Sequence, residues 1–252
     1  MYFQKQSSYQ TDIKRFHNEI KYVLYHKYTR NASCILELSC GRANDLHKWI
    51  QNNIKHVVAV DIDQDAINEG IVRYNNTKTK TKVDFVQQDL LKKDCITNIE
   101  QYIPHNTSDV VICNFALHYF LETNKSFSDF IDIVNTFLKP NGYFIFMTLD
   151  GQKVFDLLQK NSLINNQLFQ IKKCYVDNDF KDFGQKINVY IETIGSYNDE
   201  FLVNYNVILN KLSSVYNICE DNDFDCRRLN TNEKQLTMLN RYVVLQRNAN
   251  MF

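Results

Sequence analysis

The 252-residue sequence is poor in proline and glycine, has no net charge and contains no long apolar run. Two prolines and six glycines are too few for a proline-rich or glycine-rich linker protein. No apolar stretch reaches the ~18 residues of a membrane-spanning helix, and the N-terminus lacks the apolar core of a signal peptide. The seven cysteines are odd in number and form no C-x-x-C pair, which favours reduced thiols. These shortages predict a soluble cytosolic protein without a membrane partner.

Lysine plus arginine and aspartate plus glutamate each number 29. A neutral chain has no global field to attract nucleic acid, so any RNA contact must come from a local basic patch. Hydrophobic residues make up 44% and charged residues 23% of the chain, which is ordinary for a folded globular protein. Because no repeat, linker or composition change divides the chain, we expect a single domain over 1–252.

Short apolar runs alternate with segments of helical spacing along most of the chain. An amphipathic helix is predicted over 12–29, within an N-terminal helical extension of 10–30. Strands are predicted at 34–38, 56–60, 83–86, 109–113 and 143–148, with helices at 45–51, 65–74, 115–138 and 154–158. This alternation indicates an α/β fold with a doubly wound, mostly parallel sheet over 32–160. In 161–252 we expect a strand at 186–194, a helix at 200–215 and a strand at 242–246 that completes the sheet.

Small and acidic residues follow three of the predicted strands. The loop Glu37–Asp45 combines small residues with the start of a helix, and Asp61 lies twenty positions after Gly41. Asp89 follows the third strand. Each feature alone is usually a turn or a helix cap, but ligands of open α/β sheets bind where the strands end. The loop lacks G-x-G-x-x-G and a Walker lysine, which disfavours dinucleotides and nucleoside triphosphates.

Three segments resemble one family. Arg15–Lys21, Leu36–Asp45 and Asn114–Tyr119 are similar to motifs of the mRNA cap guanine-N7 methyltransferases, and the resemblance covers residues 12–150 well. It implies a class I S-adenosylmethionine-dependent methyltransferase (Rossmann-like) fold. It also implies methyl transfer from S-adenosylmethionine to guanine N7 of the 5′ cap of RNA, with S-adenosylhomocysteine as product.

Within this family the chain resembles the methyltransferase domain of multifunctional capping enzymes from large cytoplasmic DNA viruses. That resemblance implies capped RNA (GpppN) as substrate and the remaining domains of a capping enzyme as partners. It places the protein in the cytoplasm, a viral factory or the virion.

The resemblance also assigns site residues. For the cofactor it implies Lys21, Glu37, Ser39, Gly41, Asp61, Ile62, Asp89, Leu90, Asn114, Phe115 and Tyr119. For the cap it implies His17, Arg42, Asp45, Arg73, Phe115, His118, Tyr119, Glu200 and Tyr242, with Arg42, Asp45 and Arg73 toward the triphosphate. Asn240 is an alternative to Tyr242.

Guanine N7 has an available lone pair and no proton to lose, so the transfer needs alignment rather than a general base. We therefore expect no catalytic residue: His118 positions the base, and Glu200 accepts from the guanine N1–H and amine. Tyr119 and Phe115 supply stacking surface. Taken alone, His118 and Tyr119 would be core residues and Glu200 a helix-start carboxylate. Because the string Asn114–Tyr119 directly follows a strand, it favours a cap-binding role for His118 and Tyr119. For Glu200 the cap-binding role and the helix-start role are equally favoured.

The sequence departs from the family pattern in the cofactor loop. Ser39, Ala43 and Asn44 stand where the family commonly has glycine, so the cofactor pocket is expected to be narrower. His17 replaces a usual Asn, Asn114 a usual Gln, and Leu149 a usual Pro.

Two other functions stay open. The neutral charge is compatible with a methyltransferase for small molecules or proteins, and the altered loop with a non-catalytic subunit of the same fold. The sequence contains neither a Cys/His cluster with zinc spacing nor a Ser/His/Asp arrangement that we can place, so we expect no metal and no hydrolase activity.

Overall fold

The computed structural model describes residues 12–192, 194–224, 229 and 231–249. Its elements are α1 (Asp12–Thr29), β1 (Cys34–Leu38), α2 (Leu46–Gln51), β2 (His56–Asp61), α3 (Gln64–Asn75), β3 (Lys82–Gln87), α4 (Cys95–Ile99), β4 (Ser108–Asn114), the 3-10 helix η1 (Leu117–Phe120), α5 (Asn124–Phe137), β5 (Leu138–Leu149), α6 (Gly151–Lys160), β6 (Leu163–Asn165), β7 (Phe169–Lys173), β8 (Lys186–Ile191), β9 (Tyr197–Phe201), α7 (Tyr205–Leu212), β10 (Tyr216–Asp223), α8 (Thr231–Thr237) and β11 (Asn240–Arg247).

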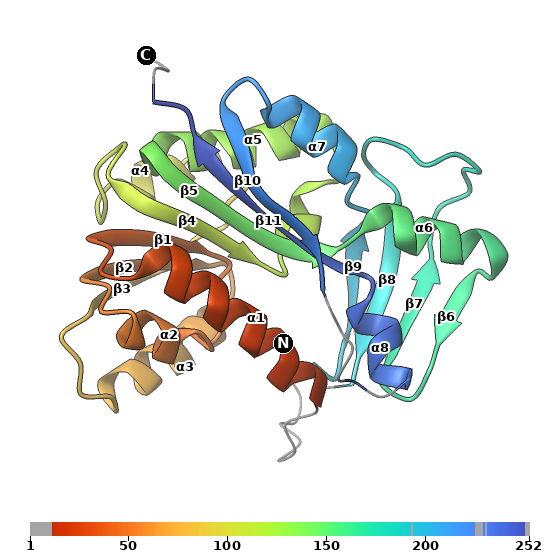
Figure 1. The fold of residues 1–252 in the computed structure, drawn as a ribbon, viewed down its shortest axis with the longest axis horizontal. Coiled ribbons are helices and arrows are strands. Elements are labelled where there is room, and N and C mark those ends of the chain that lie inside the picture. Colours follow the sequence, from red (N-terminus) through yellow and green to blue (C-terminus); the bar gives the residue numbers. More distant parts are fainter. Residues whose placement is uncertain (1–11, 193, 225–228, 230, 250–252) are drawn as a thin grey trace.

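The main sheet has seven strands in the order β10-β11-β5-β4-β1-β2-β3. Strands β1 to β5 run parallel, and β11 and β10 add to them antiparallel. Helices lie on both faces, with α1, α2 and α3 on one side and α4, α5 and α7 on the other (Figure 1). This confirms the predicted doubly wound, mostly parallel α/β sheet.

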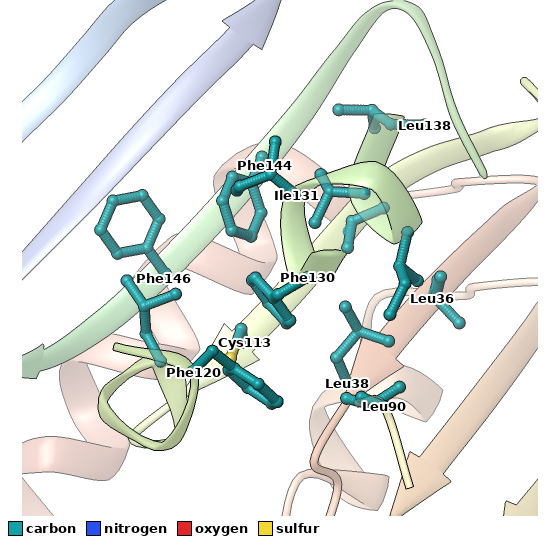
Figure 2. Packing of buried hydrophobic residues seen from close by; sticks show 14 of the residues in the cluster. Leu36, Leu38, Leu90, Cys113, Phe120, Phe130, Ile131, Leu138, Phe144 and Phe146 are labelled. Carbon is teal, nitrogen blue, oxygen red and sulfur yellow. The ribbon is translucent and has the colours of Figure 1, made fainter. Parts of the chain in front are cut away.

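Alternating residues of the strands fill two cores, because successive side chains of a strand point to opposite faces. Leu36 and Leu38 of β1 pack with Phe130 of α5 and Phe144 of β5 (Figure 2). On the other face, Ile35 of β1 packs with residues of α1 and α2 that include Tyr25 and Trp49. Burying such aromatic side chains contributes much of the stability of the fold.

A second, four-stranded antiparallel sheet has the order β6-β7-β8-β9. Its inner residues, such as Ile171 and Val189, pack with Val154 of α6 and Leu236 of α8. The sequence predicted a strand at 186–194, which β8 confirms, but not its three partners. The sheet precedes β10 and β11 in the chain and places β9 next to η1.

Two helix predictions were wrong. The segment 115–138 does not form one helix: it divides into η1 and α5, because Thr123 caps α5 through reciprocal hydrogen bonds with Ser126. The segment 200–215 begins as strand β9, and helix α7 starts only after Asn204, whose side chain caps it. Glu200 is therefore a strand residue and not a helix-start carboxylate.

Within the described residues, no helix is long and apolar enough to cross a membrane. Six cysteines lie in the described part of the chain and are free thiols. The seventh, Cys226, lies outside it.

Gly151 is the first residue of α6, which lies between the main sheet and the second sheet in the chain. The backbone of Val203 leaves no room for a side chain at this position. The Gly151 N–H donates to the carbonyl of Val203 at 3.0 Å, and a Cβ on Gly151 would lie 2.5 Å from the Val203 backbone. We expect Gly151→Ala to lower the free energy of unfolding by about 3 kcal/mol, because the two backbones must separate. Urea unfolding checks this, with Gln152→Ala at the exposed neighbouring position as the control. Equal effects of the two substitutions would contradict the steric explanation.

Candidate functional site

Asp61 joins the ends of β1 and β2 at the carboxyl edge of the sheet. One carboxylate oxygen accepts from the N–H of Gly41 at 2.6 Å, and the other accepts from the N–H of Asp63 at 2.9 Å. Burial raises the pKa of Asp61, while these backbone donors oppose the rise. The carboxylate is thus held at the mouth of the loop, and its remaining lone pairs are available to hydroxyl donors.

The loop between β1 and α2 contains three residues in the left-handed backbone region. Their φ angles are 58° at Ser39, 53° at Gly41 and 53° at Ala43. For residues other than glycine this conformation brings Cβ close to the backbone carbonyl and costs free energy. Two positions where the sequence departs from the glycine pattern therefore adopt the conformation that favours glycine.

Glu37 lies under this loop in a buried polar network. It is 3% exposed and accepts from the Tyr25 hydroxyl and from Trp49 Nε1, the latter at 3.1 Å. Asn114 Nδ2 donates to the same Tyr25 hydroxyl at 3.3 Å, whereas Asn114 Oδ1 is buried without a partner in the described part of the chain. Burial and the neighbouring Asp45 raise the pKa of Glu37. The network fixes the floor of the site between β1 and β4.

Asp45 lies between two lysines and faces inward. Lys21 Nζ is 2.7 Å and Lys48 Nζ 2.6 Å from its Oδ1. Although burial opposes ionisation, these ammonium groups hold the pKa of Asp45 below its ordinary value. Lys21 and Asp45, expected on the cofactor and triphosphate sides respectively, are thus one ion pair. Asp45 orients Lys21 and is turned away from the surface.

The residues after β2 and β3 differ in exposure. Asp89 is half-buried, and its Oδ1 accepts from the N–H of Leu91 at 2.9 Å. Leu90 is buried, whereas Ile62 is 57% exposed. An exposed isoleucine next to Asp61 offers apolar surface at the edge of the loop.

His118 and Glu200 form a buried polar pair between η1 and β9. His118 Nδ1 lies 2.9 Å from Thr148 Oγ1 and 3.6 Å from Glu200 Oε2. His118 Nε2 is buried and has no hydrogen-bond partner among the residues that the structure describes. Tyr119 packs edge-on against His118, with the two ring centroids 4.2 Å apart, and remains 41% exposed.

Burial keeps both members of this pair neutral. It lowers the pKa of His118 to about 3 and raises the pKa of Glu200 to about 8. At neutral pH the imidazole therefore carries one proton and the carboxyl group retains its own. The pair offers donors and acceptors in a dry environment, where hydrogen bonds are stronger than in water.

An aromatic cluster joins four segments beside this pair. The rings of His17 and Phe115 are stacked at 5.4 Å and 16°, and Phe224 meets His17 edge-on at 5.1 Å. Tyr242 extends the cluster through Phe224. Phe115 has a φ of 55°, and such strain in a non-glycine residue often marks a functional position. Burial, followed by the charge of Lys21, lowers the pKa of His17 to about 4.

Phe224 was missed by the sequence analysis. It is one apolar residue among polar neighbours at the end of β10, so it belongs to no periodic pattern. Only tertiary structure brings it to Phe115.

The two C-terminal candidates differ in orientation. Tyr242 belongs to the aromatic cluster, and its hydroxyl donates to Glu220 Oε2 at 3.0 Å and accepts from Asn222 Nδ2 at 3.1 Å. Asn240 is 3% exposed, and its Nδ2 donates to the carbonyl of Leu236 at 2.8 Å. Tyr242 thus presents its ring to the cluster, while the Asn240 side chain is used to end α8.

The two arginines lie on α3 and on the loop before α2. Arg42 Nη1 is 3.0 Å from Glu69 Oε2, and Arg73 Nη1 donates to Asn44 Oδ1 at 2.6 Å.

Leu149 is partly buried and packs with the core of the second sheet. Within the described residues, no group of three or more His, Cys, Asp and Glu side chains could hold a metal ion.

Replacing Ser39 by glycine is expected to stabilise the protein. Glycine adopts φ near 58° without the left-handed penalty of ~1–2 kcal/mol, and part of this gain is offset by the entropy of its unfolded state. We expect Ser39→Gly to raise the free energy of unfolding by about 0.5–1 kcal/mol, measured by urea denaturation. Ala66→Gly in helix α3 is the control and should destabilise by about 1 kcal/mol or more. A destabilised Ser39→Gly variant would show that the serine side chain outweighs the backbone cost.

The pKa of Glu200 predicts a pH dependence of stability. Folded Glu200 keeps its proton up to about pH 8, whereas unfolded glutamate releases it near pH ~4.3. Protonation of Glu200 therefore stabilises the folded protein at low pH, and this stabilisation is lost as the pH rises through about 8. From about pH 5 to pH 8, the wild type should lose up to about 1.4 kcal/mol per pH unit relative to Glu200→Gln. Urea unfolding across this range measures the difference, with exposed Glu19→Gln as the control. A difference independent of pH would contradict the raised pKa.

The chain is similar in sequence to mRNA-capping enzymes of two viruses. The chain is 29% identical over 238 residues to the "Probable mRNA-capping enzyme" of Acanthamoeba polyphaga mimivirus, covering 80% of this chain and 20% of that protein. It is 25% identical over 195 residues to the mRNA-capping enzyme of African swine fever virus (isolate Pig/Kenya/KEN-50/1950), covering 69% of this chain and 22% of that protein. The chain therefore spans about a fifth of the length of these relatives.

The fold is that of S-adenosylmethionine-dependent methyltransferases. A crystal structure of such an enzyme from Clostridium acetobutylicum superimposes with a TM-score of 0.59 at 16% identity, covering 95% of this chain and 93% of that chain. Residues 2–242 match the family model of the mRNA (guanine-N(7))-methyltransferase domain. The chain belongs to the mRNA (guanine-N(7))-methyltransferase domain family.

Proposed function

We propose that the chain transfers a methyl group from S-adenosylmethionine to guanine N7 of the 5′ cap of mRNA. The observation that carries this proposal is the buried His118–Glu200 pair, with Tyr119 packed against His118. A purine edge needs donors and acceptors in a dry pocket, and its face needs an aromatic surface. Family membership makes guanine the base that the pocket would bind.

The residues at the carboxyl edge of the sheet fit the methyl donor. A Cβ on Gly41 would have nothing within 4 Å, so there is open space at the residue whose N–H binds the Asp61 carboxylate. We assign Asp61 to the ribose hydroxyls and Asp89 with Leu90 to the adenine. Lys21 and the loop around Glu37 are assigned to the methionine part. When bound, S-adenosylmethionine supplies an electrophilic methyl group on a sulfonium.

Asn114 and Phe115 connect the donor and acceptor halves. Asn114 Oδ1 is a buried acceptor without a partner in the described part of the chain, and an acceptor at this place suits a cationic ligand. Phe115 follows in its left-handed conformation and turns the chain toward His118. These two residues hold the reacting groups in line, which supplies catalysis by orientation.

Glu200 recognises the guanine. The N1–H and the exocyclic amine of guanine would donate to the Glu200 carboxylate, and such donors lower the pKa of a carboxyl group. Glu200 therefore gives up its proton to solvent when guanine binds at neutral pH. The resulting carboxylate stabilises the positive charge that methylation places on the base.

His118 acts as a positioning residue and not as a base. Its pKa of about 3 keeps it neutral, and guanine N7 has no proton to remove. Thr148 orients the imidazole at Nδ1, which leaves Nε2, without a partner among the described residues, for a bound base. We also propose that the chain works as one module of a longer capping enzyme, because it spans a fifth of its viral relatives.

Substitutions separate the two halves of the site. His118→Ala and Glu200→Ala should each reduce kcat/KM for GpppRNA by about 100-fold or more, because the base is no longer aligned. Both variants should still bind S-adenosylhomocysteine by calorimetry. Asp61→Ala should lose cofactor binding and activity together.

The assay follows labelled methyl transfer to GpppRNA and to m7GpppRNA. Exposed Glu19→Ala is the control for Glu200→Ala and should retain full activity. Transfer to both RNAs, or to neither, would contradict guanine N7 as the acceptor. Normal cofactor binding by Asp61→Ala would contradict the donor half of the assignment.

A further inference from the structure

The loop between α3 and β3 presents three lysines to solvent. Threonine and lysine alternate from Thr77 to Lys82, and the three lysines of this run are exposed while Thr81 is buried. The Thr77 hydroxyl donates to the carbonyl of Arg73 at 2.8 Å, and the Thr79 hydroxyl accepts from the N–H of Thr81 at 3.0 Å. The threonines hold the loop against the protein and thereby direct the lysines outward.

Lys55 enlarges this basic surface. The N–H of Lys82 donates to the carbonyl of Lys55 at 2.9 Å where β2 and β3 begin, and Lys55 is exposed. Lys82 is paired with Asp84 at 2.6 Å. The ammonium groups of Lys55, Lys78 and Lys80 form no ion pair or hydrogen bond with any described residue. Three positive charges are therefore available to an anionic ligand.

The lysine surface adjoins two arginines that contact α3: Arg73 belongs to this helix, and Arg42, on the loop before α2, pairs with its Glu69. Arg42 pairs with Glu69, Arg73 follows Glu69 by one helical turn and binds Asn44, and Thr77 follows Arg73 by another turn. The end of α3 thus connects Arg73, and through Glu69 also Arg42, with the lysine loop that follows the helix. In a chain with no net charge, positive side chains that follow one line indicate an extended polyanion.

We propose that Lys55, Lys78 and Lys80 bind backbone phosphates of the first transcribed nucleotides of capped RNA, beyond the triphosphate at Arg42 and Arg73. This inference rests on the proposed function. The RNA leaves the site along α3 and passes over the start of β3. Lysines on flexible stems contact phosphates as point charges without reading sequence, so binding along this path depends on RNA length and salt but not on sequence.

The test compares two substrates: the dinucleotide GpppG and a capped RNA of roughly 20 nucleotides, longer than the ~4–16 nucleotides of one single-strand site. Lys78→Gln/Lys80→Gln should raise KM for the long RNA about tenfold at low salt and leave kcat and GpppG methylation unchanged. The slope of log KM against log salt should fall by about 1.4, because each lost single-strand phosphate contact removes about 0.7.

The matched control removes the same charge elsewhere. Lys160 on α6 and Lys172 on β7 are exposed, and Lys160→Gln/Lys172→Gln should behave as the wild type with both substrates. An equal rise in KM for both double variants would overturn the path, because net charge would then explain the effect. Unchanged KM and salt slope in Lys78→Gln/Lys80→Gln would also overturn it.

Failure of the proposed function gives a different result. A wild-type protein that does not methylate GpppG contradicts cap methylation and not the RNA path. Fluorescence anisotropy of the same labelled RNA then tests the path without methylation. Weaker binding by Lys78→Gln/Lys80→Gln alone supports it, and equal binding by all three proteins overturns it.

Discussion

The whole site depends on the parallel pairing of β1 with β2 on one side and with β4 on the other. Parallel strands end at the same edge, so the loop after β1, Asp61 after β2 and Asn114 at the end of β4 are brought together by backbone hydrogen bonds alone. The helices that follow β1 and β4 lie on opposite faces of the sheet (Figure 1). The chain therefore diverges at this edge, which is where open α/β sheets bind ligands. Without this strand order, the same motifs would lie on separate surfaces.

Strong local patterns made most of the main sheet predictable. Each of the five parallel strands is a short apolar run, and residues 12–29 have helical periodicity that α1 confirms. Of the second sheet only β8 was predicted; β6 has three residues and β9 reads Tyr-Asn-Asp-Glu-Phe, with little apolar alternation. The break between η1 and α5 escaped because apolar spacing continues across it. Only the Thr123 cap marks the boundary, and a threonine in a polar stretch is a weak signal.

Residues of the donor half could be proposed from the sequence because strand ends locate Gly41, Asp61 and Asp89. The acceptor half required a resemblance, since Glu200 comes from a strand of the second sheet that the sequence did not predict. The structure adds what spacing cannot supply: Asp45 is turned inward onto Lys21, and Phe224 joins Phe115 and His17. Such contacts depend on the orientation of α1 and on the position of Phe224 directly after β10. They are properties of the tertiary fold and leave no periodic trace in the chain.

The distribution of charge reconciles a neutral chain with an anionic substrate. Among the described residues, the buried charged groups include five carboxyl groups, those of Glu37, Asp45, Asp150, Glu200 and Glu233, but only two ammonium groups, those of Lys21 and Lys48. Burial also raises the pKa of Glu37 and Glu200, which keeps protons on acids that would otherwise be charged. The fold thus buries or neutralises part of the negative charge, so that fewer surface carboxylates offset the charge of the exposed lysines. Net charge counted from the sequence cannot show this, because it weights a buried carboxyl and an exposed ammonium group equally. A substrate, in contrast, meets only the surface field.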